Sequence, residues 1–100
     1  MFRQNVGSAP REHRVSEVTM YTTGFCAYCV AAKNFLKARG ASYTEVRVDT
    51  DPTRRAEMME KSRRSSVPQI FIGGNHVGGY EELVALDRAG DLKPLLEGAA

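Results

Sequence analysis

Residues 15–40 read "VSEVTMYTTGFCAYCVAAKNFLKARG", and they place a strand pattern, a pair of cysteines and a helix pattern in direct succession. In the first part, Val18 and Met20 fall on one side of an extended chain, while polar side chains fall on the other. This alternation is typical of a strand, and we expect one over residues 15–22. A Thr-Gly pair then ends the strand just before the cysteines.

Apolar residues at helical spacing follow the first cysteine and predict a helix over residues 27–39. Gly40 stands where a helix commonly ends, and Lys37 and Arg39 fall in the last turn, where the helix dipole favours cations. We expect four residues to form the packing face of this helix: Val30, Ala31, Phe35 and Ala38. The helix would therefore begin at the cysteine pair.

The rest of the chain continues with strand and helix patterns. We expect a strand at 43–49, a helix at 52–62, paired strands at 67–72 and 75–77, and helices at 80–89 and 92–96. Asp51 and Pro52 suit the N-cap and first position of a helix, and Gly73-Gly74 suits a hairpin turn. A strand-helix-strand opening predicts a parallel pair, to which the hairpin adds two antiparallel strands. The expected fold class is α/β, with one mixed sheet of four strands and helices on both faces.

Length and charge limit the class of protein. A chain of 100 residues is enough for one small domain. We expect a flexible N-terminal tail over residues 1–16 and the domain over residues 17–98. Fourteen basic against twelve acidic residues leave a net charge of +2, which is too small to indicate nucleic acid or an anionic membrane as the main partner. Charged residues also interrupt every apolar run before it reaches the length of a membrane span.

The chain holds two cysteines, Cys26 and Cys29, at the expected start of a helix. The free N–H groups and the positive dipole end of a helix favour a thiolate, and the first cysteine of such a pair feels them most. We therefore expect Cys26 to be the nucleophile. Cys29 is close enough to attack a mixed disulfide at Cys26, which makes it the candidate resolving thiol. Tyr28, between them, can cover a peptide-like substrate with its ring.

Other uses of the cysteine pair have less support. A zinc site needs four ligands, and the chain adds only His13 and His76 to the cysteines. A structural disulfide would close a very short loop and gain little stability, and two inert core cysteines are the remaining alternative. Because both cysteines lie in one motif, we expect a reducing compartment and a cytoplasmic protein.

Three further segments can contact a ligand. Val67-Pro68 starts an apolar strand, and a cis bond there would expose the backbone of Val67 to an extended peptide, although an ordinary trans proline is the simpler interpretation of the dipeptide alone. Gly78-Gly79 precedes a helix whose N–H groups can hold a carboxylate, although a simple turn is the commoner use of such a pair. The basic cluster over residues 54–64 is usually a solvated face, but one or two of its members can bind a small anion.

The segments "CAYC", "SVPQIFI" and "GGYEEL", in this order, resemble the glutaredoxin family from about residue 18 to residue 96. The resemblance implies a thioredoxin-like fold and glutathione-dependent reduction of protein-glutathione mixed disulfides and protein disulfides. Carried over by position, it makes Cys26 the nucleophile and Cys29 the resolving cysteine. The residues that it assigns to glutathione are Tyr28, Arg64, Val67, Pro68, Gly79, Tyr80 and Glu81, with Gln69 as a further candidate.

Three positions depart from the family pattern. Ala27 replaces the proline of the usual Cys-Pro-Tyr-Cys motif, which leaves an additional N–H donor and a less restricted turn. Thr23 stands where a lysine is often found shortly before the motif. Glu81 and Glu82 replace paired aspartates, so the acidic contact is one methylene longer.

The resemblance also implies what the protein works with. Its co-substrate would be glutathione and its partners glutathionylated or disulfide-containing proteins, and we expect a monomer without a metal or a tightly bound cofactor. One alternative is a dimer in which Cys26 of each copy and two glutathiones bind a [2Fe-2S] cluster, although the Cys-Gly-Phe-Ser motif of the family's cluster carriers is absent. Another alternative is a hydrogen donor for a single enzyme, reduced by thioredoxin reductase.

Overall fold

The computed structural model describes residues 15–98 of the chain. Its elements are β2 (Val18–Thr22), α1 (Ala27–Ala38), β3 (Thr44–Arg47), α2 (Pro52–Ser62), β4 (Gln69–Ile72), β5 (Asn75–Gly78), α3 (Tyr80–Arg88) and α4 (Leu92–Leu96). Every expected element is present, in the expected order. Most of the strands are shorter than expected, and Val67 and Pro68 belong to the loop before β4. No helix within the described range is long and apolar enough to cross a membrane.

The four strands form one mixed sheet in the order β3-β2-β4-β5. β2 is parallel to β3, with Tyr21 opposite Val46, and antiparallel to β4 on its other side. β4 and β5 form a hairpin whose turn residues, Gly73 and Gly74, have φ angles of 57° and 87°. Two successive positive φ angles match the twist of paired strands and favour glycine. The predicted mixed sheet and its hairpin are confirmed.

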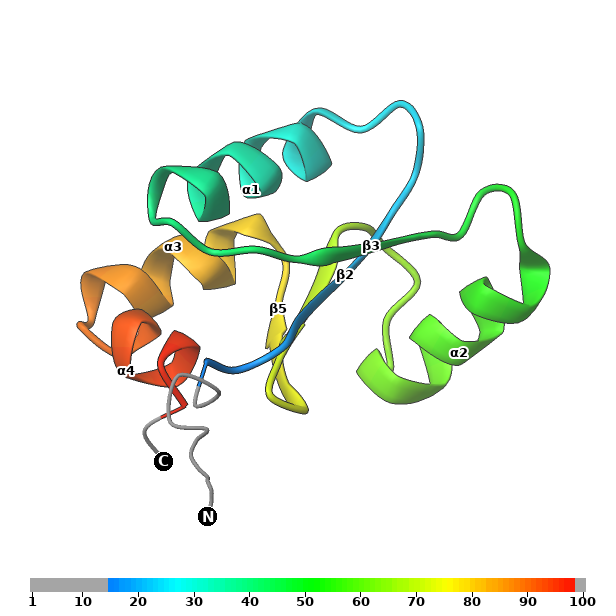
Figure 1. Ribbon diagram of the computed structural model, residues 1–100. Helices are drawn as coiled ribbons and strands as arrows, with labels where there is room; N and C mark the ends of the chain where they lie inside the picture. The colour runs from blue at the N-terminus through cyan, green and yellow to red at the C-terminus, as the bar shows by residue number, and fades with distance from the viewer. Residues whose placement is uncertain (1–14, 99–100) are drawn as a thin grey trace, which may run out of the picture.

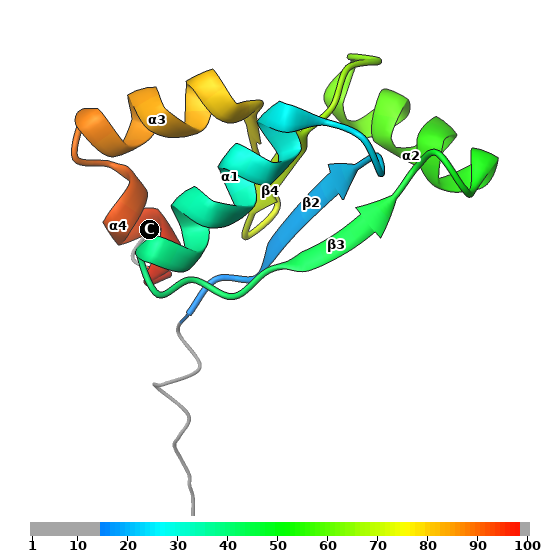
Figure 2. The same ribbon diagram turned by 90° about the horizontal axis from the view of Figure 1, so that it is seen from above.

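Helices cover both faces of this sheet (Figure 1). Figure 2 shows α1 and α3 side by side on one face, where Met20 of β2 joins the larger cluster of buried side chains. On the other face, Met58 of α2 packs with Tyr21 and Val48 in a smaller cluster. Because β2 is an interior strand, neighbouring residues such as Met20 and Tyr21 enter different cores. The end of β2 is thus held from both sides, and the loop to the cysteines starts from a rigid position.

α1 presents a different face to the core from the one expected. Its buried residues are Cys29, Ala32 and Leu36. Phe35 is partly buried, whereas Val30 is 53% exposed and Ala38 is exposed too. The expectation was wrong for Val30 and Ala38, although Phe35 packs against the core cluster as expected. Alanines on several sides of the helix blur the apolar stripe, which follows the spacing i, i+3, i+7 from the second cysteine. That cysteine therefore belongs to the core face of the helix.

The segment just before β2 is held by hydrogen bonds to the C-terminal helix, α4. The N–H of Ser16 donates to the carbonyl oxygen of Leu96 (2.8 Å), and its hydroxyl donates to that of Leu95 (2.7 Å). Ser16, at the end of the expected tail, thus contacts the folded domain. Residues 1–14 and 99–100 lie outside the described range, together with His13, so the division into tail and domain stays a prediction.

Candidate active site

Cys26 lies where the loop after β2 turns into α1. It is the N-cap residue of the helix, with extended backbone angles (φ −152°, ψ 109°). Its Sγ accepts the backbone N–H of Cys29 at 3.1 Å and lies 3.8 Å from the carbonyl oxygen of Val67. This half-buried sulfur occupies a helix N-terminus, where an N–H donor and the helix dipole favour negative charge. The predicted place of Cys26 at the start of a helix is confirmed.

Cys29 lies in the first turn of α1 but in a different environment. Its side chain is 1% exposed and packs on the core side of the helix. Burial, followed by the hydrogen bond to Cys26, raises the pKa of Cys29 to about 12, while the N–H of Thr23 acts in the opposite direction. Cys29 is therefore a protonated thiol at neutral pH, shielded from solvent.

An open groove of about 300 Å³ lies next to the cysteines. Its lining residues are Tyr28, Arg64, Ser66, Val67, Pro68, Gln69, Gly79, Tyr80, Glu81 and Glu82. All of the residues that the sequence assigned to glutathione are in this lining, although they come from α1, from the loop between α2 and β4, from the first residue of β4 and from the start of α3. Val67 connects the groove to Cys26, because its carbonyl oxygen lies 3.8 Å from the sulfur.

The loop that carries Val67 is supported by Gln69. The Val67-Pro68 peptide bond is cis, and Pro68 is buried. Gln69 is fully buried, its amide nitrogen donates to the carbonyl oxygen of Ser66 (3.0 Å), and its amide oxygen lies 2.7 Å from Nε2 of His76. Since both polar atoms are bonded inside the protein, the side chain of Gln69 is committed to the loop.

The N-terminus of α3 contributes another part of the groove. Glu82 accepts the N–H of Gly79 through Oε1 at 2.7 Å, and this bond is the main cause of the lowered pKa of the Glu82 carboxyl group. The same oxygen lies 3.6 Å from Nη1 of Arg64. Tyr80 lies near Tyr28, with ring centroids 6.2 Å apart. The sequence-based assignment omitted Glu82, although its place three residues after Gly79 has the spacing of a capping box.

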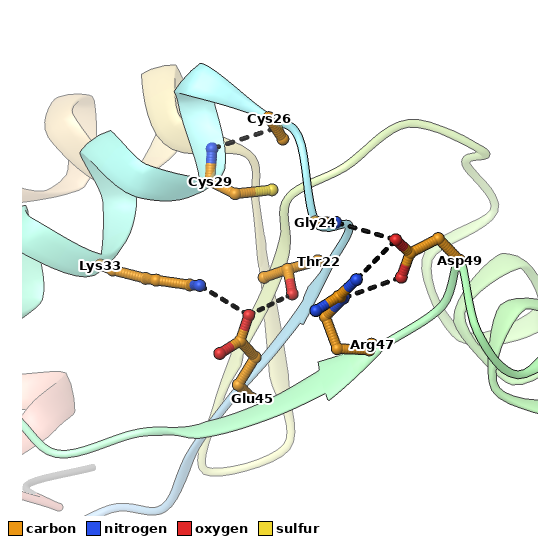
Figure 3. Close-up of polar contacts among 8 residues, drawn as sticks. All are labelled: Thr22, Gly24, Cys26, Cys29, Lys33, Glu45, Arg47 and Asp49. Atoms are coloured by element: carbon orange, nitrogen blue, oxygen red, sulfur yellow. Dashed lines mark hydrogen bonds and ion pairs between the residues drawn. The ribbon is translucent and has the colours of Figure 1, made fainter.

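A second set of polar contacts holds the loop between β2 and Cys26 (Figure 3). The carboxylate of Asp49 accepts the N–H of Gly24 at 2.9 Å, and Nε and Nη2 of Arg47 at 2.8 and 2.7 Å. Arg47, followed by the N–H of Gly24, lowers the pKa of Asp49. A Cβ at Gly24 would lie 2.6 Å from Nη2 of Arg47, so a side chain here would displace the guanidinium and open this contact. The sequence analysis placed Arg47 and Asp49 only within the expected strand over residues 43–49, and nothing in their spacing indicates that they reach the loop.

These features define a class of protein. One thiol caps a helix, a second thiol is buried in its first turn, and both sit on a mixed four-stranded sheet with helices on both faces. This is the fold and the site of a thioredoxin-like thiol-disulfide oxidoreductase. Within residues 15–98, no group of three or more His, Cys, Asp or Glu side chains could hold a metal ion.

Comparison with known proteins shows the family within this class. The Glutaredoxin family model matches residues 18–77. Glutaredoxin of Pseudomonas aeruginosa is 47% identical over 79 residues, which cover 79% of this chain and 94% of that protein. Glutaredoxin 3 of Escherichia coli strain K12 is 43% identical over 83 residues, which cover 83% of this chain and 100% of that protein. The chain belongs to the glutaredoxin family and is a glutathione-dependent thiol-disulfide oxidoreductase.

Solved structures agree with this assignment. The solution structure of glutaredoxin from Brucella melitensis superimposes with a TM-score of 0.77 at 42% identity, covering 87% of this chain and 95% of that one. The crystal structure of a buckwheat glutaredoxin-glutathione complex has a TM-score of 0.77 at 26% identity, covering 84% of this chain and 79% of that one. The predicted thioredoxin-like fold is therefore confirmed.

Proposed function

We propose that Cys26 is the nucleophile that removes glutathione from protein mixed disulfides. Its thiolate attacks the glutathione sulfur, a bond forms between these two sulfurs, and the protein sulfur leaves as a thiolate that takes a proton from solvent. A second glutathione thiolate then attacks the glutathione sulfur held on Cys26. This step releases glutathione disulfide and regenerates the Cys26 thiolate, so glutathione is the only reductant required.

The observation that carries this proposal is the position of the groove relative to Cys26. Val67 lines the groove, and its carbonyl oxygen is 3.8 Å from the Cys26 sulfur. A tripeptide bound in the groove would therefore bring its own sulfur close to the helix N-cap. The buckwheat relative, which was solved as a complex with glutathione, supports the choice of ligand.

We assign one end of glutathione to the side of the groove next to α2. The side chain of Arg64 is 45% exposed, and its guanidinium is suited to the glycyl carboxylate. Val67 would pair with the backbone of the tripeptide as one strand pairs with another, and Pro68 would hold Val67 in position. Tyr28, which is 58% exposed, would cover the ligand beside the sulfur.

We assign the γ-glutamyl end to the start of α3. The backbone of Gly79 and Tyr80 lies at a helix N-terminus, which favours the carboxylate of the γ-glutamyl group. Glu81 is exposed beside it, and its carboxylate would pair with the amino group. Glu82 would keep this end of the helix in place through its bond to Gly79.

We further propose a dithiol route for protein disulfides. Cys26 attacks the disulfide, and Cys29 then attacks the resulting mixed disulfide, which releases the reduced protein and leaves a Cys26–Cys29 disulfide for glutathione to reduce. Both routes fit a cytoplasmic monomer that carries no tightly bound cofactor and acts on glutathionylated or disulfide-containing proteins.

The test is glutathione-coupled reduction of a glutathionylated peptide by the wild type, Cys26→Ser and Cys29→Ser. We expect Cys26→Ser to lose activity by at least about a thousandfold, because the attacking atom is gone, and Cys29→Ser to keep it within about tenfold. Reduction of a protein disulfide should fail in both variants. Wild-type protein that is inactive with glutathione, or a Cys26→Ser variant that retains activity, would overturn the proposal.

A further inference from the structure

The second half of the dithiol route poses an electrostatic problem. Cys29 must lose its proton before it can attack, yet its side chain is 1% exposed. A buried thiolate is costly unless a neighbouring charge stabilises it. The question is which group near Cys29 supplies that charge.

Lys33 is in the right place. It lies four residues after Cys29 on α1, which puts both side chains on the same face of the helix, one turn apart. Figure 3 shows the Lys33 side chain extended beneath the cysteines toward Glu45 of β3. Nζ of Lys33 lies 2.6 Å from Oε2 of Glu45, and the buried hydroxyl of Thr22 donates to the same oxygen at 2.6 Å.

The other charged groups around Cys29 either oppose a thiolate there or are paired with each other. On α1, Cys26 opposes a thiolate at Cys29 only while Cys26 is not part of a mixed disulfide, whereas the Lys33 charge favours that thiolate and acts against the effect of burial on the Cys29 pKa. From β3 and the residues after it, Arg47 and Asp49 form a closed pair with each other and with the N–H of Gly24. The loop contributes the N–H of Thr23.

Glu45 and Lys33 share one ion pair at the surface. Their side chains are 32% and 24% exposed, so solvent screens the pair only in part. The contact with Glu45 is the main cause of the raised pKa of Lys33, so the amine is charged at neutral pH. The phenol of Tyr43 also acts on Lys33, more weakly. The carboxylate of Glu45 offsets the field of the ammonium group at any nearby site.

We propose that Lys33 is a positioning residue for the resolving half of the reaction: its ammonium group stabilises the thiolate that Cys29 forms before it attacks, and Glu45 limits how much of that charge acts on the sulfur. This inference rests on the proposed role of Cys29. In the step concerned, Cys29 gives its proton to solvent and its thiolate attacks the Cys26 sulfur. The Cys26–Cys29 bond forms as the bond between Cys26 and its partner sulfur breaks, and the partner, which is the substrate protein in the dithiol route and glutathione in the experiment below, leaves as a thiolate that takes up a proton.

The experiment isolates this step in the full-length protein. Cys26 is first glutathionylated with glutathione disulfide in acidic buffer, where Cys29 is inert. A jump to neutral pH then starts formation of the Cys26–Cys29 disulfide, which is followed by acid quench and intact-mass spectrometry. The variants are Lys33→Met, Lys33→Arg, Glu45→Gln and, as a matched control, Lys37→Met, which removes the same charge one turn further along the exposed side of α1.

The proposal makes two opposite predictions. Lys33→Met should slow disulfide formation about three- to tenfold and move its pH profile to higher pH, while Glu45→Gln should speed it about two- to fivefold and move the profile to lower pH. Lys33→Arg should stay near the wild type, and Lys37→Met should change the rate less than about twofold.

The outcomes distinguish an electrostatic role of Lys33 from a merely structural one. Lys33→Met and Glu45→Gln break the same ion pair, so a merely structural role predicts a change in the same direction for both and would overturn the inference. Equal rates in all variants would overturn it as well. Failure of the proposed function looks different, because wild-type Cys26 would then not accept glutathione in the first step.

Discussion

Cys26 and Cys29 are the same residue type, separated by two positions on one helix, and they have opposite environments. Cys26 is half-buried at the N-cap, accepts an N–H and lies next to the groove. Cys29 is 1% exposed on the core face, where burial raises its pKa to about 12. Helix geometry explains why the two environments differ: the cap position meets solvent and free N–H groups, whereas the first turn meets the core.

The largest effect expected from this difference is in chemical reactivity. At neutral pH, iodoacetamide should label Cys26 at least about a hundredfold faster than Cys29, because Cys29 is buried and its pKa is raised, whereas Cys26 is accessible. The raised pKa of about 12 means that the thiolate fraction of Cys29 grows with pH, so its labelling should rise between neutral and alkaline pH, by up to about tenfold per pH unit. Fragment spectra of the peptide that holds both cysteines distinguish the two sites.

The control for this experiment is urea-unfolded protein, in which the two cysteines should label at similar rates. Equal labelling of both thiols in the folded protein would contradict the difference in environment, since it would mean that Cys29 is as accessible as Cys26.

The second effect concerns stability. Cys29→Ser should lower the free energy of unfolding by about 1–3 kcal/mol, because it buries a hydroxyl among apolar side chains. Cys26→Ser should change it by less than about 0.5 kcal/mol, since serine is a preferred N-cap residue and can accept the same N–H. Urea denaturation with a constant slope measures both values. A larger loss for Cys26→Ser than for Cys29→Ser would contradict the assigned environments.

The smallest effect concerns the turn between the cysteines. Ala27 is the first residue of α1, and Cys26 before it has the extended angles that a following proline requires (φ −152°, ψ 109°). Ala27→Pro should therefore raise the free energy of unfolding by about 0.4–1 kcal/mol, because it restricts the unfolded chain without straining the folded one. Thermal unfolding followed by circular dichroism checks this, with Ala27→Gly as the control expected to shift the midpoint the opposite way.

Local structure could largely be predicted from the sequence because its signals are local. Asp51 and Pro52 marked the start of α2, and the Asp51 carboxylate accepts the N–H of Thr53 at 3.0 Å as an N-cap does. Gly73-Gly74 marked the hairpin, and both residues have positive φ angles. The family resemblance identified most of the groove residues, although not why they meet. Glu82 could have been found from its capping spacing, whereas the contacts of Arg47 and Asp49 with Gly24 could not.

The sequence alone determined the order of strands and helices and the position of the cysteine pair at a helix start, because caps, turns and alternation act over a few residues. It also determined the family, through its three motifs. Only the tertiary structure decided that Cys29 faces the core and that Lys33 meets Glu45. It also decided how Tyr28, Arg64 and Glu81, which the family resemblance had assigned to one ligand, are arranged around one groove. These relations depend on packing between segments far apart in the chain, and the side-chain pattern of each segment carries no information about which distant residues it will meet.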